Sequence, residues 1–391
     1  MKTFYFIVLN SEINKVGSVG FRAQKIISDL ESQGHSILLV SRDRIIKSES
    51  SNFIHKSYFL FSYIFKLLKL IRISFYPKLS DRLFESIFLD FFSRKILNKL
   101  DLECPRKILL TFEFTPKLNQ LASKKGFLIF HDIQIIPTSF ALDLKKEGLI
   151  KNLKETSQLK SLIKREIESI RSATKVICPS KFVEDYLISN LGKLNSSIAV
   201  CPFGVDLKLF SFHNSEGEVN PTVNFGFLGQ ISERKGVKFL LDSFQDERFK
   251  DCNLFLGGEL QKTNIDFSIE DYNKSNIHFL GKINQLDFFK KIDILVHPSL
   301  IEGSAKVIYE AMATGVVPIA TINSGSIIED KKNGLIVKAG DVGDLRKKMI
   351  YLLDNYPNKV LLENIKNTIR NYSWNDYSLR YTRLIEQLIN Q

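Results

Sequence analysis

Two glutamates separated by seven residues are the most distinctive chemical feature of this sequence. Glu302 stands just before a run of good helix formers, and Glu310 lies two turns inside that run. Both side chains can therefore reach one crevice from different depths. Carboxylates accept short, charge-assisted hydrogen bonds from hydroxyl groups, so the pair predicts a site for a polyhydroxylated ligand. Two solvated surface glutamates could show the same spacing.

The residues around this pair predict a strand, a loop and a helix. An apolar strand over 294–296 leads into Gly303 and Ser304, and we expect the helix to begin with Ser304 as its N-cap and to end at Gly315 in a left-handed conformation. A helix that opens at the carboxyl end of a parallel strand directs unpaired N–H groups into a crevice, where a phosphate can bind. Gly303 would let the backbone approach such a ligand closely.

A second loop with phosphate-binding character occurs in the same half of the chain. It follows a strand predicted over 223–229 and precedes a helix predicted over 236–246, and it places Arg234 and Lys235 at the helix start. Two such loops and two carboxylates suit a ligand with a central diphosphate and hydroxyl-bearing rings at both ends. This layout describes a nucleotide-sugar.

The start of the chain predicts a β-α-β unit of the doubly wound kind. A buried strand over 2–9, a helix over 21–33 and a strand over 35–40 enclose a loop that contains Gly17 and Gly20. A phosphate or a sugar could meet the backbone at these glycines. A plain turn would use glycine equally well.

His131 follows a strand predicted over 127–130. Ligands meet such folds at the carboxyl ends of the parallel strands, so His131 could hydrogen-bond a substrate hydroxyl or stabilise developing charge. A capping or structural histidine is the alternative.

The whole chain predicts an α/β fold with two doubly wound, parallel-sheet domains. Strands and helices alternate in both halves, and Pro, Gly and Asn cluster between Pro202 and Pro221. Residues 1–200 hold 32 Lys and Arg against 19 Asp and Glu, whereas residues 201–391 hold 23 against 24. We therefore expect domains over 1–204 and 205–371, with a last helix over 372–391.

Residues 57–76 form the most apolar part of the chain, and cations interrupt the run too often for a membrane span. These cations are Lys66, Lys69 and Arg72. On a helix they would share one face, as in helices that lie in the surface of an anionic membrane. An amphipathic helix packed on its own domain is the alternative. The basic first half suits anionic lipid or nucleic acid, but no recognisable nucleic-acid recognition module accompanies it.

Cysteine usage and the N-terminus point to a reducing compartment. The four cysteines are scattered without a C-x-x-C pair or a histidine at ligand spacing, which argues against a structural zinc site. The first apolar run is short and lacks a small-residue cleavage site, so we expect a first strand and no signal peptide.

Five segments of the chain resemble the retaining glycosyltransferases of family four, which have the GT-B architecture of two facing Rossmann-like domains. The segments are CPSKF at 178–182, VCPFGVD at 200–206, FLGQISERKG at 227–236, PSLIEGSAKVIYEAMATG at 298–315 and NGLIV at 333–337. The resemblance covers nearly the whole chain, and the paired glutamates are its most specific part. It implies that the last helix crosses back onto the first domain.

The resemblance implies roles for single residues. Glu302 matches the residue that contacts the donor sugar near the reacting centre, Glu310 the one that binds the nucleotide ribose, and His131 a first-domain histidine at the donor sugar. Lys235 matches the lysine that neutralises the diphosphate. The backbone that cradles the diphosphate corresponds to Gly303, Ser304 and Ala305, and the first-domain glycine loop near it to Gly17 and Gly20.

The chain departs from the family at one position. Gln230 stands where the family usually has arginine, and a neutral amide cannot offset phosphate charge. We therefore expect either that Arg234 takes this part or that the donor binds more weakly. No metal and no other cofactor is expected, since cationic side chains and a helix terminus would stabilise the leaving diphosphate.

Together these features predict a hexose transfer with retention of anomeric configuration, from a nucleotide-sugar donor to a glycan or lipid-linked glycan. We expect a cytoplasmic protein held peripherally at the inner face of the membrane, with no nucleic-acid partner. Two alternatives are a GT-B nucleotide-sugar 2-epimerase and a basic, non-enzymatic protein that binds membranes or nucleic acid.

Overall fold

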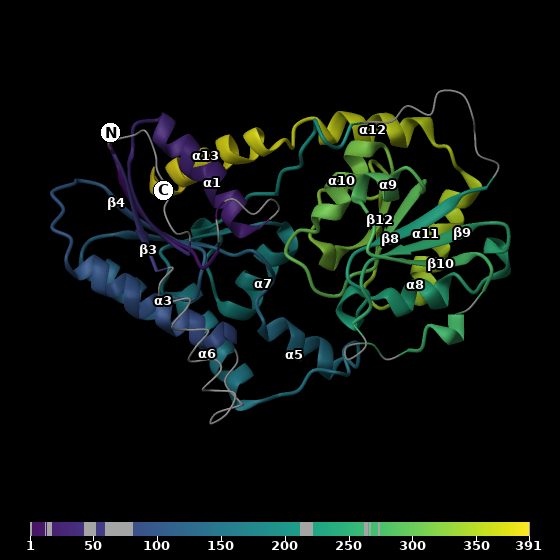
Figure 1. Ribbon diagram of the computed structural model, residues 1–391, viewed down its shortest axis with the longest axis horizontal. Helices are drawn as coiled ribbons and strands as arrows, with labels where there is room; N and C mark the ends of the chain where they lie inside the picture. The colour runs from purple at the N-terminus through teal and green to yellow at the C-terminus, as the bar shows by residue number, and fades with distance from the viewer. Residues whose placement is uncertain are drawn as a thin grey trace.

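Figure 1 shows two α/β domains side by side, with the last helix returning to the first domain. In the computed structural model the described residues are 2–11, 13, 18–42, 52–58, 81–211, 222–261, 265, 267–272 and 274–390. In this part of the chain, no helix combines the length and the apolar character that are needed to cross a lipid bilayer.

The first domain is built on a seven-stranded parallel sheet in the order β3-β2-β1-β4-β5-β6-β7. Its strands are β1 (Phe4–Val8), β2 (Ser36–Ser41), β3 (Phe53–Ser57), β4 (Lys107–Thr111), β5 (Leu128–Asp132), β6 (Lys175–Cys178) and β7 (Ile198–Val200). Its helices are α1 (Val19–Ser32), α3 (Asp81–Asn98), α4 (Pro116–Lys124), α5 (Ser139–Lys146), α6 (Ser157–Ser172) and α7 (Lys181–Leu191).

Alternate residues of β1 point to opposite faces of this sheet, because the side-chain period of a strand is two. Tyr5 and Ile7 pack with α1, whereas Phe6 and Val8 pack on the side of α4, α6 and α7. Both faces of the central strand are thus buried. This burial explains why β1 is a continuous apolar run.

The second domain has a six-stranded parallel sheet in the order β10-β9-β8-β11-β12-β13. Its strands are β8 (Asn224–Leu228), β9 (Asn253–Gly257), β10 (Ile277–Gly281), β11 (Ile294–His297), β12 (Val317–Thr321) and β13 (Leu335–Val337). Its helices are α8 (Val237–Ser243), α9 (Gln285–Phe289), α10 (Lys306–Thr314), α11 (Val342–Asp354) and α12 (Lys359–Ile369). The predicted fold class of two parallel-sheet α/β domains is confirmed.

The chain passes between the domains at two neighbouring points. Val205 N–H donates to the carbonyl of Tyr372 over 2.8 Å, and the two segments form a parallel bridge there. Gly204 is required at this crossing, because a Cβ atom on it would lie 2.9 Å from the Cα of Trp374. The last helix, α13 (Trp374–Asn390), then packs along α1 of the first domain.

Two expectations about helices differ from the structure. The Lys- and Glu-rich residues 151–173 predict one long helix. Helix α6 begins only at Ser157, because Thr156 caps it by accepting a hydrogen bond from Leu159 N–H over 3.1 Å. The cationic helix expected over 57–76 is wrong at its start, since Ser57 belongs to β3. Its remaining residues from 59 onward, with Lys66, Lys69 and Arg72, lie outside the described residues.

Candidate active site

A cavity of about 380 Å³ opens at the carboxyl ends of β8, β9 and β10, beside the start of α10. We call it the second-domain cavity. It brings together Lys235 of one sequence motif with Glu302 and Glu310 of the other. Its other lining residues are Leu228, Gly229, Gly257, Gly258, Lys282, Ile283, Gln285, Ser304, Ala305, Lys306 and Val307.

Glu302 is the most heavily contacted acidic group of this cavity. One of its oxygens, Oε1, pairs with Lys235 Nζ, lies 3.3 Å from Arg234 and accepts from Ser299 Oγ over 3.1 Å. Burial opposes ionisation of Glu302, but nearby His297 and the cations of Lys235 and Arg234 lower its pKa below the usual value. Glu302 is therefore a carboxylate at neutral pH.

The second oxygen of Glu302, Oε2, has no polar partner within the described ranges. It can accept a hydrogen bond from a ligand hydroxyl without displacing any contact that positions the side chain. Lys235 is itself mostly buried, and burial lowers its pKa while Glu302 opposes that change. A second anion beside Lys235, such as a diphosphate, would stabilise its charged form.

Glu310 lies deeper along α10 and accepts a hydrogen bond from Gln285 Nε2 over 3.3 Å. Burial raises the pKa of Glu310 to about 7, and the charge of Lys306 one turn earlier opposes this rise. Glu310 thus changes its charge near neutral pH. Its carboxylate form accepts stronger hydrogen bonds from hydroxyl groups than its protonated form does.

The start of α10 differs from the expectation in its details. The N-cap is Ala305, and Ser304 is not the cap, because its Oγ shares a 2.7 Å hydrogen bond with the Tyr309 hydroxyl. Ala305 N–H donates to the carbonyl of Ser324 over 2.9 Å, so this amide is already occupied. Gly315 ends the helix in the left-handed conformation as predicted, with φ of 87°.

Gly303 packs against the first domain and not against the cavity. A Cβ atom on it would lie 2.1 Å from the carbonyl oxygen of Gln134. Its own carbonyl accepts from Ser180 Oγ over 2.6 Å, and the carbonyl of Glu302 accepts from Ile136 N–H over 3.2 Å. The segment that carries Glu302 is therefore fixed by both domains.

Gln230 and Arg234 do not line the second-domain cavity. Gln230 is exposed, and Arg234 donates from NH1 to the carbonyl of Ile301 over 2.7 Å. Arg234 thus braces the loop that carries Glu302. The additional cations at the cavity are Lys282 and Lys306.

His131 lies at the end of β5 in a separate cavity of about 290 Å³ in the first domain. It is 1% exposed, its ring stacks on Phe114 at 6.3 Å, and its Nδ1 has no hydrogen-bond partner among the residues described. Burial lowers the pKa of His131 to about 3, and Lys193 adds to this effect. His131 is neutral at physiological pH and can bind a hydroxyl, but it cannot supply a positive charge.

The first-domain cavity also contains Glu113, Glu166 and Arg82. Burial raises the pKa of Glu113 to about 7, although Asn10 N–H donates to its carboxylate over 3.1 Å. A mixture of carboxylates, a guanidinium and aromatic rings suits a hydroxyl-rich ligand. Of the two glycines expected near the diphosphate, Gly17 lies outside the described residues, and Gly20 is buried in the first turn of α1.

A second set of contacts joins the two domains at Glu233 and Leu300. The Glu233 carboxylate accepts from Lys151 N–H over 2.6 Å and from Asn152 N–H over 3.1 Å. Next to it, Leu144 and Ile150 of the first domain pack on Leu300 of the second. The loop that carries Arg234 and Lys235 is therefore joined to the first domain by Glu233, the residue that precedes these two cations.

Sequence reasoning missed several cavity residues. Lys306 lies between the paired glutamates and is the first residue of α10. This position at the helix start could have identified it as a cavity residue. Lys282 and Gln285 come from the loop and helix after β10 and share no motif with the other residues. Nor did reasoning from the sequence assign a role to Glu113, although it lies only two residues after the end of β4.

The fold and the two cavities define a class of protein architecture. Two parallel-sheet domains that meet across the carboxyl ends of their strands form the GT-B architecture. The solved sucrose-phosphate synthase from Thermosynechococcus elongatus shares it with a TM-score of 0.70, at 16% identity over 100% of both chains. At this identity the similarity establishes the fold alone.

The sequence of the second domain is similar to one known family. Residues 211–371, which make up most of the second domain, match the family model described as glycosyl transferases group 1. An uncharacterised glycosyltransferase of Methanocaldococcus jannaschii is 32% identical over 56% of this chain and 60% of its own length. The Escherichia coli UDP-Gal:alpha-D-GlcNAc-diphosphoundecaprenol alpha-1,3-galactosyltransferase is 21% identical over 53% of this chain and 58% of its own. The match thus spans about 60% of the length of these relatives.

Proposed function

We propose that the protein is a retaining glycosyltransferase that moves a hexose-type sugar from a nucleoside-diphosphate sugar to a glycan or lipid-linked glycan. The observation that carries this proposal is the convergence of Lys235, Glu302 and Glu310 on one cavity beside the start of α10. A nucleotide-sugar requires positive charge and a helix terminus for its diphosphate, and two carboxylates that accept hydrogen bonds from its hydroxyl groups. The match of residues 211–371 to the model of glycosyl transferases group 1 supports the same activity.

The donor would bind with its diphosphate between Lys235 and the first turn of α10. Lys306 and Lys282 line the same cavity and would add the positive charge that Gln230 does not supply. Glu310 would accept hydrogen bonds from the ribose, because it lies deeper in the cavity than the helix start. The free Oε2 atom of Glu302 would accept a hydrogen bond from the transferred sugar.

Departure of the nucleoside diphosphate would be stabilised by the lysines and the helix terminus, so the proposed reaction needs no metal ion. As the glycosidic bond to the leaving oxygen breaks, negative charge grows on the diphosphate beside Lys235. The acceptor hydroxyl would attack from the same face and pass its proton to the leaving phosphate. His131 would bind the donor sugar through a neutral imidazole ring.

The first-domain cavity is the proposed place of the acceptor sugar. Its carboxylates and guanidinium suit hydroxyl groups, and Gln134, which lines it, lies against Gly303 of the second domain. The E. coli relative acts on a lipid-linked acceptor by its name. We propose a similar acceptor here, and the basic first half supports a peripheral position at the cytoplasmic face of an anionic membrane.

The proposal is tested by thermal unfolding of the full chain with a panel of nucleoside diphosphate sugars. A ligand that binds only the folded state raises the melting temperature in a concentration-dependent way. We expect one sugar nucleotide to stabilise the wild type and to have no effect on Lys235→Ala. The anomeric configuration of the product, followed by proton NMR, then tests retention. If no member of the panel stabilises the protein or is consumed, the proposal is refuted.

A further inference from the structure

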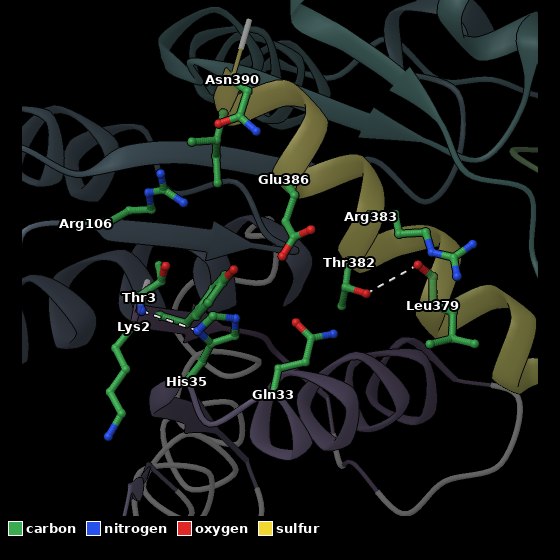
Figure 2. A pocket seen from close by; sticks show the side chains of 12 residues that line it. Lys2, Thr3, Gln33, His35, Arg106, Leu379, Thr382, Arg383, Glu386 and Asn390 are labelled. Carbon is green, nitrogen blue, oxygen red and sulfur yellow. Dashed lines mark hydrogen bonds between the residues drawn. The ribbon is translucent and has the colours of Figure 1, made fainter.

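The largest of the three cavities lies on the opposite side of the first domain from the candidate active site. It measures about 860 Å³ and is enclosed by the N-terminal ends of β1 and β2, the end of α1 and the last helix, α13. Figure 2 shows Glu386 projecting from α13 into this space, with Gln33 and His35 on the other side. We call it the α13 cavity.

Hydroxyl groups form the floor of the α13 cavity. Thr3, Tyr5 and Thr382 line it and are 2–3% exposed. Thr382 is already engaged, because its hydroxyl donates to Asp29 of α1 over 2.6 Å. The Tyr5 hydroxyl makes no hydrogen bond to the other described residues. Its oxygen is still reached by solvent through the cavity, so water or a ligand hydroxyl can bond to it.

Opposite charges face the α13 cavity without pairing. Glu386 and Arg106 both influence the pKa of Tyr5 and of His35, yet they form no ion pair with each other. Within the described residues neither side chain has a hydrogen bond or an ion pair. An anion and a cation that are held apart across one space can be bridged by a ligand that both donates and accepts hydrogen bonds.

His35 presents a donor to the same space. Its Nδ1 accepts from Thr3 N–H over 3.3 Å, so the ring proton of the neutral imidazole is on Nε2. Burial lowers the pKa of His35, which keeps the ring neutral at physiological pH. The wall of the cavity therefore offers a neutral N–H, the guanidinium groups of Arg106 and Arg383, the ammonium group of Lys2, one carboxylate and amides.

We propose that the α13 cavity binds a neutral oligosaccharide. Sugar hydroxyls can donate to Glu386 and accept from Arg106 and His35 at the same time, whereas a fully ionised phosphate has no proton to donate to Glu386. Figure 2 shows Lys2 extending away from Glu386, so this lysine does not offset the carboxylate. Pockets for drug-sized ligands measure about 300–1,000 Å³, and the observed volume leaves room for more than one sugar ring.

The position of the cavity defines what such a site would do. Thr3 lies at the start of β1 and Asn10, in the first-domain cavity, at its end, so the two cavities are separated by roughly 23 Å of strand at about 3.3 Å per residue. A single reacting sugar cannot reach both. An extended glycan can, so the α13 cavity would hold a remote segment of a long acceptor. This role rests on the proposed function, whereas the binding itself does not.

Binding is tested on the full-length protein with a printed array of neutral oligosaccharides, followed by calorimetric titration of the best binder. We expect Glu386→Gln and Arg106→Ala each to weaken this binding by at least tenfold, since each removes a charged hydrogen-bond partner. Gln387→Ala, the exposed neighbour outside the cavity, is the matched control and should bind as the wild type does. Glu386→Gln should leave the thermal stabilisation by a sugar nucleotide unchanged.

Three results would overturn the proposal: no array member binds, both variants bind as tightly as the wild type, or inorganic phosphate binds in an Arg106-dependent way and displaces the oligosaccharide. The last result would identify an anion site. With an active enzyme, Glu386→Gln should raise KM for long acceptors only and leave kcat unchanged. Loss of donor binding with intact oligosaccharide binding would refute the proposed function and leave the α13 site in place.

Discussion

Replacing Gly303 with alanine should separate the two domains without unfolding either of them. The new Cβ atom would lie 2.1 Å from the carbonyl oxygen of Gln134 and 2.7 Å from the Cα of Ile135, both of which are backbone atoms of the other domain. Ordinary C···O contacts are about 3.3 Å, so the two segments must move apart by about 1.2 Å. No side-chain rotation can relieve this contact.

The cost follows from the bonds that this movement breaks. The hydrogen bonds from Ile136 N–H to the Glu302 carbonyl and from Ser180 Oγ to the Gly303 carbonyl both cross the interface. At about 1 kcal/mol each, their loss shifts the closed arrangement by about 2 kcal/mol, or about thirtyfold in population. Glu302 would move with the segment, and a misplacement of about 1 Å near a reacting centre lowers turnover by about 100-fold.

The assay combines X-ray scattering, circular dichroism and steady-state transfer kinetics. We expect a larger radius of gyration, an unchanged helical signal and a fall in kcat. Gly343→Ala is the control, because the nearest atom to its Cβ is 3.4 Å away in the first turn of α11. A Gly303→Ala protein that keeps both the wild-type radius of gyration and the wild-type kcat would refute the steric argument.

Three other outcomes are expected. Lys235→Ala should lower transfer at least 100-fold with unchanged circular dichroism, and near-normal turnover would remove Lys235 from the site. Donor affinity should rise as pH increases through about 7, because Glu310 then becomes ionised; calorimetric titration should show this slope in the wild type and a flat profile in Glu310→Gln. Flotation with anionic vesicles tests the cationic stretch of the first half, which contains Lys66, Lys69 and Arg72. Vesicle binding should be lost when all three cations are replaced by glutamate. Unchanged flotation of this variant would exclude the stretch as a membrane anchor.

The parallel strands could be predicted from the sequence because burial on both faces makes them continuous apolar runs. The edge strands β3 and β13 were missed, since one is only half-buried and the other has three residues. Helix α3 was missed for a related reason: its apolar residues, such as Ile87 and Phe91, are partly exposed and show little periodicity. Predicted boundaries failed mainly where a cap decides the helix start, as at Thr156.

The candidate site was predictable to the extent that its residues share local motifs. Glu302, Lys235 and Glu310 meet in one cavity, as helix and strand geometry suggested. The direction of Arg234 and the contact of Gly303 could not be derived, because both depend on how the domains meet. The α13 cavity was equally hidden, since it is assembled from the two ends of the chain and from residues near 33 and 106.

The last helix has a consequence for the synthesis of this protein. Tyr377 and Tyr381 of α13 are fully buried, and Tyr377 accepts a hydrogen bond from Arg22, which in turn pairs with Asp132 beside His131. Domains generally fold as units while the chain leaves the ribosome, N-terminal part first. Here the first domain can cover this apolar surface only after α13 has been synthesised, so completion of the first domain depends on a segment that follows the whole second domain in the chain.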